Sequence, residues 1–217
     1  MGGVRIAPEG WRIIGAVGAV LGGTALVAGL AAGWWWGVPV AVAGVGFCTW
    51  FFRDPERVPP PGDRLVVSPA DGRVVDVRAV EERELLGAAA TRVSIFMSPL
   101  DVHVNRSPVA GRIEAVRYVP GRFRAAFADK ASDDNERTGM LLATGRRRYL
   151  VVQIAGALAR RIVCRRAVGD ALERGERYGL IMFGSRVDVY LPPDVAVRTA
   201  VGARVRAGAS VIGEEPA

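Results

Sequence analysis

The chain has 217 residues, 50% of them hydrophobic, and a formal net charge of +7 that is carried almost entirely by arginine, because Lys130 is the only lysine. This length allows one fair-sized domain and an appendage. His103 is the only histidine and the two cysteines form no CxxC pair, which excludes a metal centre built on several histidines or on a usual zinc spacing. The basic charge suits a nucleic acid, an anionic membrane surface or a phosphate-bearing ligand, and the excess of arginine over lysine is equally well explained by a genomic composition bias.

The first 52 residues are predicted to anchor the chain in a membrane. No charged residue occurs from Ile13 to Phe52, a run about twice the roughly 20 residues that cross a bilayer once as a helix. Its middle, 33–39, holds three tryptophans between glycine and proline, which favours a turn at a membrane interface. We therefore expect a helical hairpin, with helices near 13–32 and 38–52, that either crosses the bilayer or re-enters it.

Positive charges flank this apolar run at both ends, Arg12 before it and Arg53 and Arg57 after it. Because positive residues stay on the cytoplasmic side, both ends of the hairpin and the domain that follows are expected at the cytoplasmic face of the cell membrane. A secretory signal peptide is the alternative, but the run is too long, and its second half would remain after cleavage.

Residues 53–217 are predicted to form a second domain of the mainly β class. Charges and prolines replace the apolar run over 53–62, which marks the boundary between the domains. Beyond it, short apolar-alternating segments are separated by glycine and proline, a pattern typical of a β-sandwich or a barrel-like fold. The expected strands are 72–80, 92–97, 112–119, 148–154, 161–165, 177–182, 187–191 and short ones near Val205 and Val211. Helix is weakly indicated at 81–90 and 125–130, and 131–138 is expected to be a polar loop.

The pair Gly184-Ser185 interrupts what otherwise looks like one continuous strand, between the apolar runs 178–182 and 187–191. Glycine gives the backbone freedom, and serine places a hydroxyl nucleophile beside the peptide bond that precedes it. Two structures are compatible with this pattern: a plain β-bulge, or a strained peptide bond that its own serine attacks.

Three polar clusters accompany this pair. Asp71 lies in Ser-Pro-Ala-Asp-Gly, where an ordinary turn is the simpler explanation. His103 lies in the dense polar stretch 98–108, and histidine can transfer protons near neutral pH, although a single histidine is more often structural. The third cluster, 135–137, reads Asn-Glu-Arg and could equally be a solvated loop.

Taken in order, these clusters resemble the phosphatidylserine decarboxylase family in its short, membrane-anchored, pyruvoyl-dependent form. The resemblance covers about residues 50–213 and rests on five pieces: Phe-Arg-Asp-Pro-Glu-Arg at 52–57, Ser-Pro-Ala-Asp-Gly at 68–72, Asp-Val-His at 101–103 with Pro108, Asn-Glu-Arg at 135–137, and Phe-Gly-Ser at 183–185.

The resemblance implies a self-processing enzyme. In the family the serine hydroxyl attacks the preceding carbonyl, and the chain is cut, here between Gly184 and Ser185. The products would be a β chain, 1–184, and an α chain, 185–217, which begins with a pyruvoyl group made from Ser185 and remains bound as a heterodimer, open to further oligomerisation. A pyruvoyl carbonyl accepts the electron pair that decarboxylation leaves behind. The implied substrate is phosphatidylserine in the membrane, the products are phosphatidylethanolamine and carbon dioxide, and nucleic acid is not an expected partner.

The resemblance also assigns roles. Asp71 matches the aspartate that supports self-cleavage, and His103 matches the first of two family histidines, which serves decarboxylation. The second family histidine falls at Arg106, so a complete Asp-His-Ser triad is not transferred. Arg106, Asn135 and Arg137 are candidate substrate ligands, Arg106 through bidentate contact with a phosphate or carboxylate.

Two other functions stay open: a membrane-anchored serine hydrolase that uses Ser185 and His103, and a non-enzymatic membrane-tethered β-domain. The hydrolase lacks the Gly-x-Ser-x-Gly elbow, because no glycine follows Ser185 at the required position.

Overall fold

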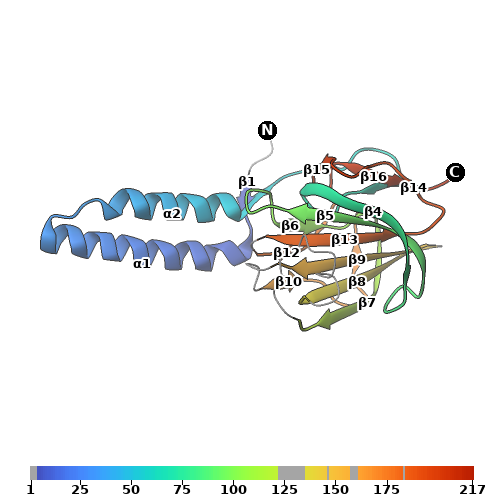
Figure 1. Cartoon of the computed structure of the whole chain (residues 1–217), viewed down its shortest axis with the longest axis horizontal. Coiled ribbons are helices and arrows are strands. Elements are labelled where there is room, and N and C mark those ends of the chain that lie inside the picture. The colour runs from blue at the N-terminus through green and yellow to red at the C-terminus, as the bar shows by residue number, and fades with distance from the viewer. Residues whose placement is uncertain (1–3, 122–134, 146, 157–160, 183) are drawn as a thin grey trace. The chain divides into compact units, whose positions relative to one another are not determined.

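The computed structural model describes residues 4–121, 135–145, 147–156, 161–182 and 184–217. The chain divides into two compact units, Met1–Glu56 and Arg57–Ala217 (Figure 1). The fold is mainly β, as predicted, with apolar helix at the N-terminus.

The N-terminal unit is a helical hairpin closed by a two-stranded ribbon. Helix α1 (Pro8–Ala32) and helix α2 (Gly37–Phe51) run side by side, and strand β1 (Val4–Ile6) pairs antiparallel with strand β2 (Arg53–Pro55) at their open end (Figure 1). Helix α1 ends at Gly33, whose φ of +68° suits glycine.

Small residues let the two helices approach closely. A Cβ atom on Gly44 of α2 would lie 2.7 Å from the Leu21 side chain of α1, and one on Gly37 would lie 2.9 Å from Ala25. Helix α1, with 25 residues, is long and apolar enough to cross a membrane, whereas α2 has 15. The three tryptophans at the hairpin turn, residues 34–36, are exposed.

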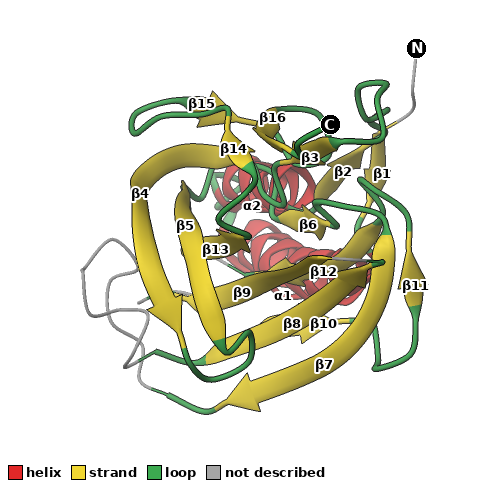
Figure 2. Cartoon of the chain, turned by 90° about the vertical axis from the view of Figure 1, so that its right-hand side faces the viewer, coloured by secondary structure: helices red, strands yellow, loops and turns green. Residues whose placement is uncertain are grey.

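The C-terminal unit is built around a curled antiparallel sheet. In the described residues this sheet has eight strands in the order β11-β7-β8-β9-β13-β5-β4-β15, and two three-stranded sheets, β10-β12-β6 and β14-β16-β3, accompany it (Figure 2). The strands are β3 (Leu65–Val67), β4 (Gly72–Glu82), β5 (Ala88–Met97), β6 (Val104–Arg106), β7 (Gly111–Val119), β8 (Arg137–Thr144), β9 (Arg147–Ala155), β10 (Ile162–Cys164), β11 (Ala171–Leu172), β12 (Arg177–Ile181), β13 (Ser185–Leu191), β14 (Ala196–Val197), β15 (Arg204–Val205) and β16 (Val211–Glu214).

The main core lies on the concave face of the large sheet. Alternate residues of each strand point there, because successive side chains of a strand face opposite sides. Val187, Val189 and Leu191 of β13 join Tyr149 and Val151 of β9 in this buried cluster. The intervening residues of β9 belong to a smaller apolar cluster on the convex face.

Three sequence predictions need correction or fall outside the described residues. The helix expected at 81–90 is wrong: β4 continues to Glu82, β5 begins at Ala88, and a turn joins them. The Glu82 carboxylate accepts backbone N–H bonds from residues 84, 85 and 86, which closes this turn. The loop expected at 131–138 is wrong at its end, since β8 begins at Arg137, and the helix expected at 125–130 lies outside the described residues.

Candidate active site

The Gly184-Ser185 pair lies where the chain leaves one sheet and enters another. Strand β12, before it, belongs to the sheet β10-β12-β6, whereas β13, which begins at Ser185, belongs to the large sheet. Of the two alternatives that the sequence left open, the plain β-bulge within one strand is wrong, because the two apolar runs pair with different partners. Gly184 has a φ of +59°, in the left-handed region that glycine adopts readily. A Cβ atom there would meet nothing within 4 Å, so conformation and not space favours glycine.

Ser185 is fixed at the start of a central strand. It faces Met97 of β5 on one side and Ala155 of β9 on the other, and its side chain is fully buried. The hydroxyl donates to the Met97 Sδ atom at 3.4 Å. A thioether is a weak acceptor, so this contact holds the hydroxyl without removing its proton.

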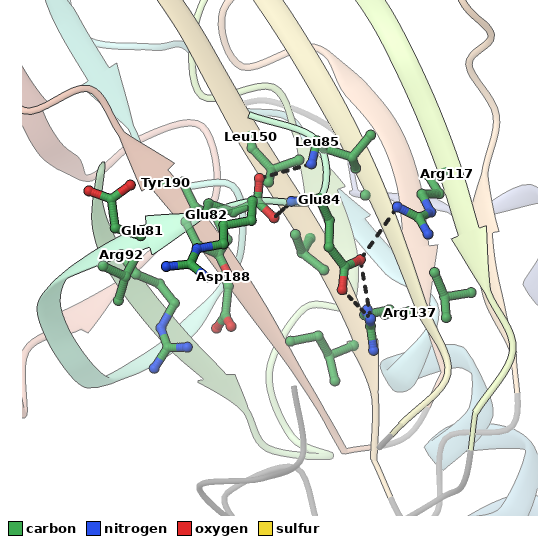
Figure 3. A pocket seen from close by; sticks show the side chains of 16 residues that line it. Glu81, Glu82, Glu84, Leu85, Arg92, Arg117, Arg137, Leu150, Asp188 and Tyr190 are labelled. Atoms are coloured by element: carbon green, nitrogen blue, oxygen red, sulfur yellow. Dashed lines mark hydrogen bonds and ion pairs between the residues drawn. The ribbon is translucent and has the colours of Figure 1, made fainter. Parts of the chain in front are cut away.

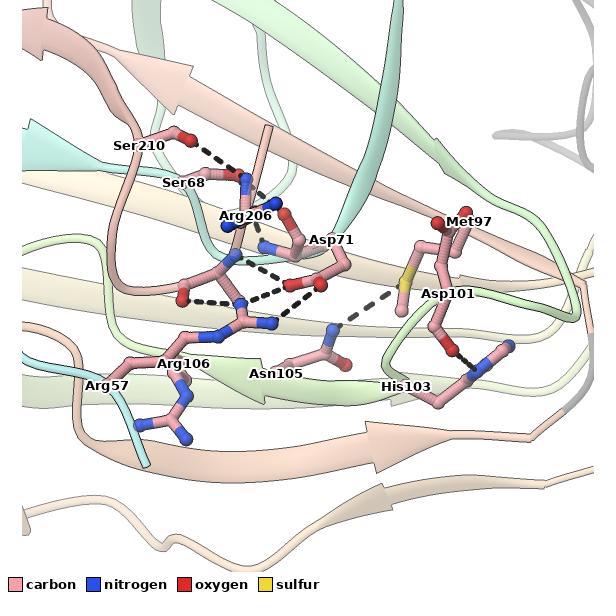
Figure 4. A network of polar contacts seen from close by, with 12 residues as sticks. Arg57, Ser68, Asp71, Met97, Asp101, His103, Asn105, Arg106, Arg206 and Ser210 are labelled. Carbon is pink, nitrogen blue, oxygen red and sulfur yellow. Dashed lines mark hydrogen bonds and ion pairs between the residues drawn. The ribbon is translucent and has the colours of Figure 1, made fainter. Parts of the chain in front are cut away.

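His103 is fully buried in the segment that leads into β6. Its Nδ1 atom lies 3.0 Å from the Asp101 carbonyl oxygen, which fixes the ring (Figure 4). Its own carbonyl oxygen accepts a bond from the Ile181 amide at the end of β12. The sole histidine is thus attached to the strand that precedes the Gly184 corner.

Asp71 is held by Arg57, which the sequence had suggested as a flanking charge and as part of the motif at 52–57 but not as a partner of Asp71. Both carboxylate oxygens accept from the Arg57 guanidinium, the Nη2–Oδ2 distance being 2.7 Å, and Oδ1 also accepts from the Ala207 amide at 2.8 Å (Figure 4). The contacts of the described residues do not join Asp71 to Ser185 or His103. The missed partner, Arg57, lies in the motif Arg-Asp-Pro-Glu-Arg, which was the available signal.

Arg106, at the position of the second family histidine, is almost fully buried. Its Nη1 atom donates to the Gly175 carbonyl oxygen at 3.1 Å, and its backbone amide donates to the Pro69 carbonyl oxygen at 2.9 Å. A Cβ atom on Gly208 would lie 2.8 Å from the Arg106 side chain, which shows how tightly it is enclosed. A direct contact between Arg106 and substrate stays a prediction.

Asn135 and Arg137, two residues apart in the chain, make contacts with different parts of the structure. Asn135 is buried, and its Nδ2 atom donates at 2.7 Å to the carbonyl oxygen of Ala155, the residue opposite Ser185. Arg137 lines a cavity of about 340 Å³ on the convex face and pairs with Glu84 at 3.1 Å (Figure 3). Tyr190 lines the same cavity, and burial raises its pKa to about 12.

Two buried amides near Ser185 escaped the sequence prediction. Gln153 of β9 donates through Nε2 to the Asn105 Oδ1 atom at 2.8 Å. The Asn105 Nδ2 atom points to the Met97 sulfur at 3.7 Å (Figure 4). The available signal for Gln153 was its position as a single amide residue in the otherwise apolar run 149–154. Among the described residues, no group of three or more acidic, cysteine or histidine side chains is arranged to hold a metal.

Comparison with known proteins identifies the family to which the chain belongs. The model of the family described as phosphatidylserine decarboxylase matches residues 45–213. The chain is 52% identical over 213 residues to a phosphatidylserine decarboxylase proenzyme of Symbiobacterium thermophilum, covering 97% of this chain and 96% of the relative. It is 46% identical over 168 residues to a proenzyme of the same name from Syntrophus aciditrophicus, covering 77% of this chain and 79% of that relative. The chain therefore belongs to the phosphatidylserine decarboxylase family and is a decarboxylase.

Proposed function

We propose that the chain is a self-processing precursor that converts phosphatidylserine to phosphatidylethanolamine and carbon dioxide at the cytoplasmic face of the cell membrane. Residues 1–52 serve as the membrane anchor and 53–217 as the catalytic domain. The observation that carries the proposal is the corner at Gly184-Ser185, with its positive φ and a serine fixed between two strands, in a chain that matches the decarboxylase family.

The processing step uses the chain's own atoms. The Ser185 Oγ atom forms a bond to the Gly184 carbonyl carbon, the peptide C–N bond breaks, and the hydroxyl proton ends on the released amine, which gives an ester. Elimination then breaks the bond from Cβ to the ester oxygen and removes the Cα proton, leaving a Gly184 carboxylate and a dehydroalanine. The dehydroalanine tautomerises to an imine. Water hydrolyses this imine, which releases ammonia and leaves a ketone at the former Cα atom of residue 185.

The surroundings of Ser185 suit a pyruvoyl group at that position. The new N-terminus would lie at the first residue of β13, which is hydrogen-bonded on both sides by β5 and β9. Cleavage would therefore leave the α chain, 185–217, bound to the β chain, 1–184, as a heterodimer. The group supplies an electron sink for the carbanion that loss of carbon dioxide leaves.

We assign roles to five residues, of which four are buried and Arg137 is half-buried. Asp71, oriented by Arg57, supports self-cleavage, and His103 handles the proton in decarboxylation. Asn135 remains a proposed substrate ligand and also supports β9 through the carbonyl oxygen of Ala155, the residue paired with Ser185. Arg106 and Arg137 remain proposed substrate ligands; the burial of Arg106 favours an effect through the turn at Gly175.

The test is intact-mass analysis of the purified chain together with an assay of carbon dioxide released from phosphatidylserine vesicles. Wild type should yield two pieces, the smaller one blocked at its amino end, and Ser185→Ala should remain one piece without activity. Arg106→Gln should weaken substrate binding and leave cleavage intact if Arg106 contacts the substrate. A wild-type chain that remains whole and still decarboxylates the lipid would overturn the proposal.

A further inference from the structure

The amide pair Asn105–Gln153 has features that packing alone does not explain. Both side chains are buried, at 0% and 1% exposure, on the concave side of the large sheet among apolar residues. Among the described residues, no donor lies against the Gln153 Oε1 atom. Buried polar groups normally have partners, so an incompletely paired buried amide calls for an explanation, and a catalytic role is one of those known.

The pair is directed at the cleavage serine. Gln153 lies two residues before Ala155, the residue opposite Ser185, so both face the same side of β9. Gln153 donates to the Asn105 Oδ1 atom, which turns the Asn105 amino group toward Met97. The Ser185 hydroxyl and the Asn105 amide nitrogen thereby approach one atom, the Met97 sulfur, at 3.4 and 3.7 Å.

A glycine keeps this arrangement free of obstruction. Gly179 of β12 pairs with Asn105, and a Cβ atom on Gly179 would lie 3.0 Å from the Gln153 Nε2 atom. The same Cβ atom would lie 2.2 Å from the Val163 carbonyl oxygen. Strand β12 therefore packs closely against the Gln153 amide, and a side chain at position 179 would push against it.

We propose that Asn105 is a further catalytic residue of chain cleavage and that Gln153 is its positioning residue; this inference rests on the proposed function. Methionine has three rotatable bonds and a flexible side chain. When the Met97 sulfur withdraws, the Asn105 N–H is released to turn toward Ser185, whose hydroxyl contacts the same sulfur atom. As the Oγ–carbon bond forms and the C–N bond breaks, this N–H donates to the oxygen on which negative charge develops, while the hydroxyl proton passes to the Ser185 amine.

The test compares cleavage rates of newly synthesised full-length chains in phospholipid nanodiscs, followed by denaturing gel and intact mass. The double variant Asn105→Leu/Gln153→Leu removes both amides at once, so that no unpaired polar partner remains. It should fold and cleave on the order of 100-fold more slowly, the usual loss when one such donor is removed. Val151→Ala, on the same face of β9, is the control: it creates a cavity but should cleave at the wild-type rate.

Asn105→Asp supplies a readout that a purely structural role would not change. The aspartate can still accept from Gln153 but lacks the N–H, so its cleavage should be slow, and its rate relative to wild type should rise as the pH falls and the carboxyl regains a proton to donate. A folded double variant that cleaves at the wild-type rate would overturn the inference. If the double variant fails to fold, an Asn105→Asp rate equal to wild type at every pH would overturn it. A wild-type chain that never cleaves would instead contradict the proposed function.

Discussion

The ion pair between Arg57 and Asp71 gives the sharpest prediction about stability and processing. Both side chains are 12% exposed, and the carboxylate accepts from the guanidinium and from the Ala207 amide. Arg57→Met would leave the carboxylate buried with one backbone donor. Removing one partner of a buried pair costs about 3–5 kcal/mol, and we expect about 3 kcal/mol because the pair retains some contact with water. For a unit of this size that corresponds to a fall in Tm of about 6–12 °C.

The assay is a double-mutant cycle measured by thermal unfolding of chains held uncleaved by Ser185→Ala. Asp71→Asn retains an acceptor for the Ala207 amide, so Arg57→Met/Asp71→Asn should return to within about 1 kcal/mol of the parent. As a control, Arg78→Met breaks a more exposed pair with Asp76 and should cost less than about 1 kcal/mol. An Arg57→Met chain as stable as the parent, or a double variant no more stable than Arg57→Met, would refute the reasoning.

Three further predictions concern single residues. Gly184→Ala should lower the free energy of unfolding by about 1–2 kcal/mol, because alanine disfavours the φ of +59°, and it should slow chain cleavage. A variant with the Tm and the cleavage rate of the parent would contradict this. His103→Gln should lower kcat of the decarboxylase by about 10²–10⁴-fold, measured on cleaved enzyme, and an unchanged kcat would remove His103 from the chemistry. The hydrogen bond from Arg147 lowers the pKa of Asp194 in the folded chain. The ionised Asp194 therefore stabilises the fold at pH values above its unfolded pKa, and this stabilisation is lost as the pH falls through its folded pKa. Asp194→Asn should reduce the dependence of Tm on pH below about 4, and a variant whose Tm falls with acid as the parent's does would disprove the linkage.

Alternation of apolar residues was enough to predict most long strands. The segments expected at 72–80, 92–97, 112–119 and 148–154 are strands within a few residues of the predicted bounds. Strand β8 was missed because residues 139–143 are apolar throughout: the strand has a core cluster on each face, and such a run has no period of two.

The helix expected at 81–90 failed for a tertiary reason. Its residues have good helix propensity, but Leu86 is buried in the cluster on the convex face, and Leu85 packs against Gly139 of β8. Burial of the hairpin turn against the sheet outweighs a local preference of a few tenths of a kcal/mol per residue.

The sequence nominated candidate residues for the site, which stay predictions, but it did not indicate their contacts. Ser185 and His103 stood out by residue type and neighbourhood. The partners of Asp71 and Asn105 did not, because Arg57 and Gln153 are brought to them by chain folding over sequence separations of 14 and 48 residues. The change of sheet at Gly184 likewise depends on long-range strand pairing that local sequence does not record.

The central place of β13 makes the proposed cleavage a one-way event for the molecule. Strands β5 and β9 must already be paired with β13 before the serine is positioned, so an unfolded precursor cannot process itself, and the cut reports that folding has succeeded. After the cut, folding is no longer unimolecular, because the separated α and β chains must associate again after denaturation. The yield of refolded enzyme then depends on protein concentration. The mature enzyme should therefore be a product that can be made once from each precursor and not reassembled efficiently after denaturation.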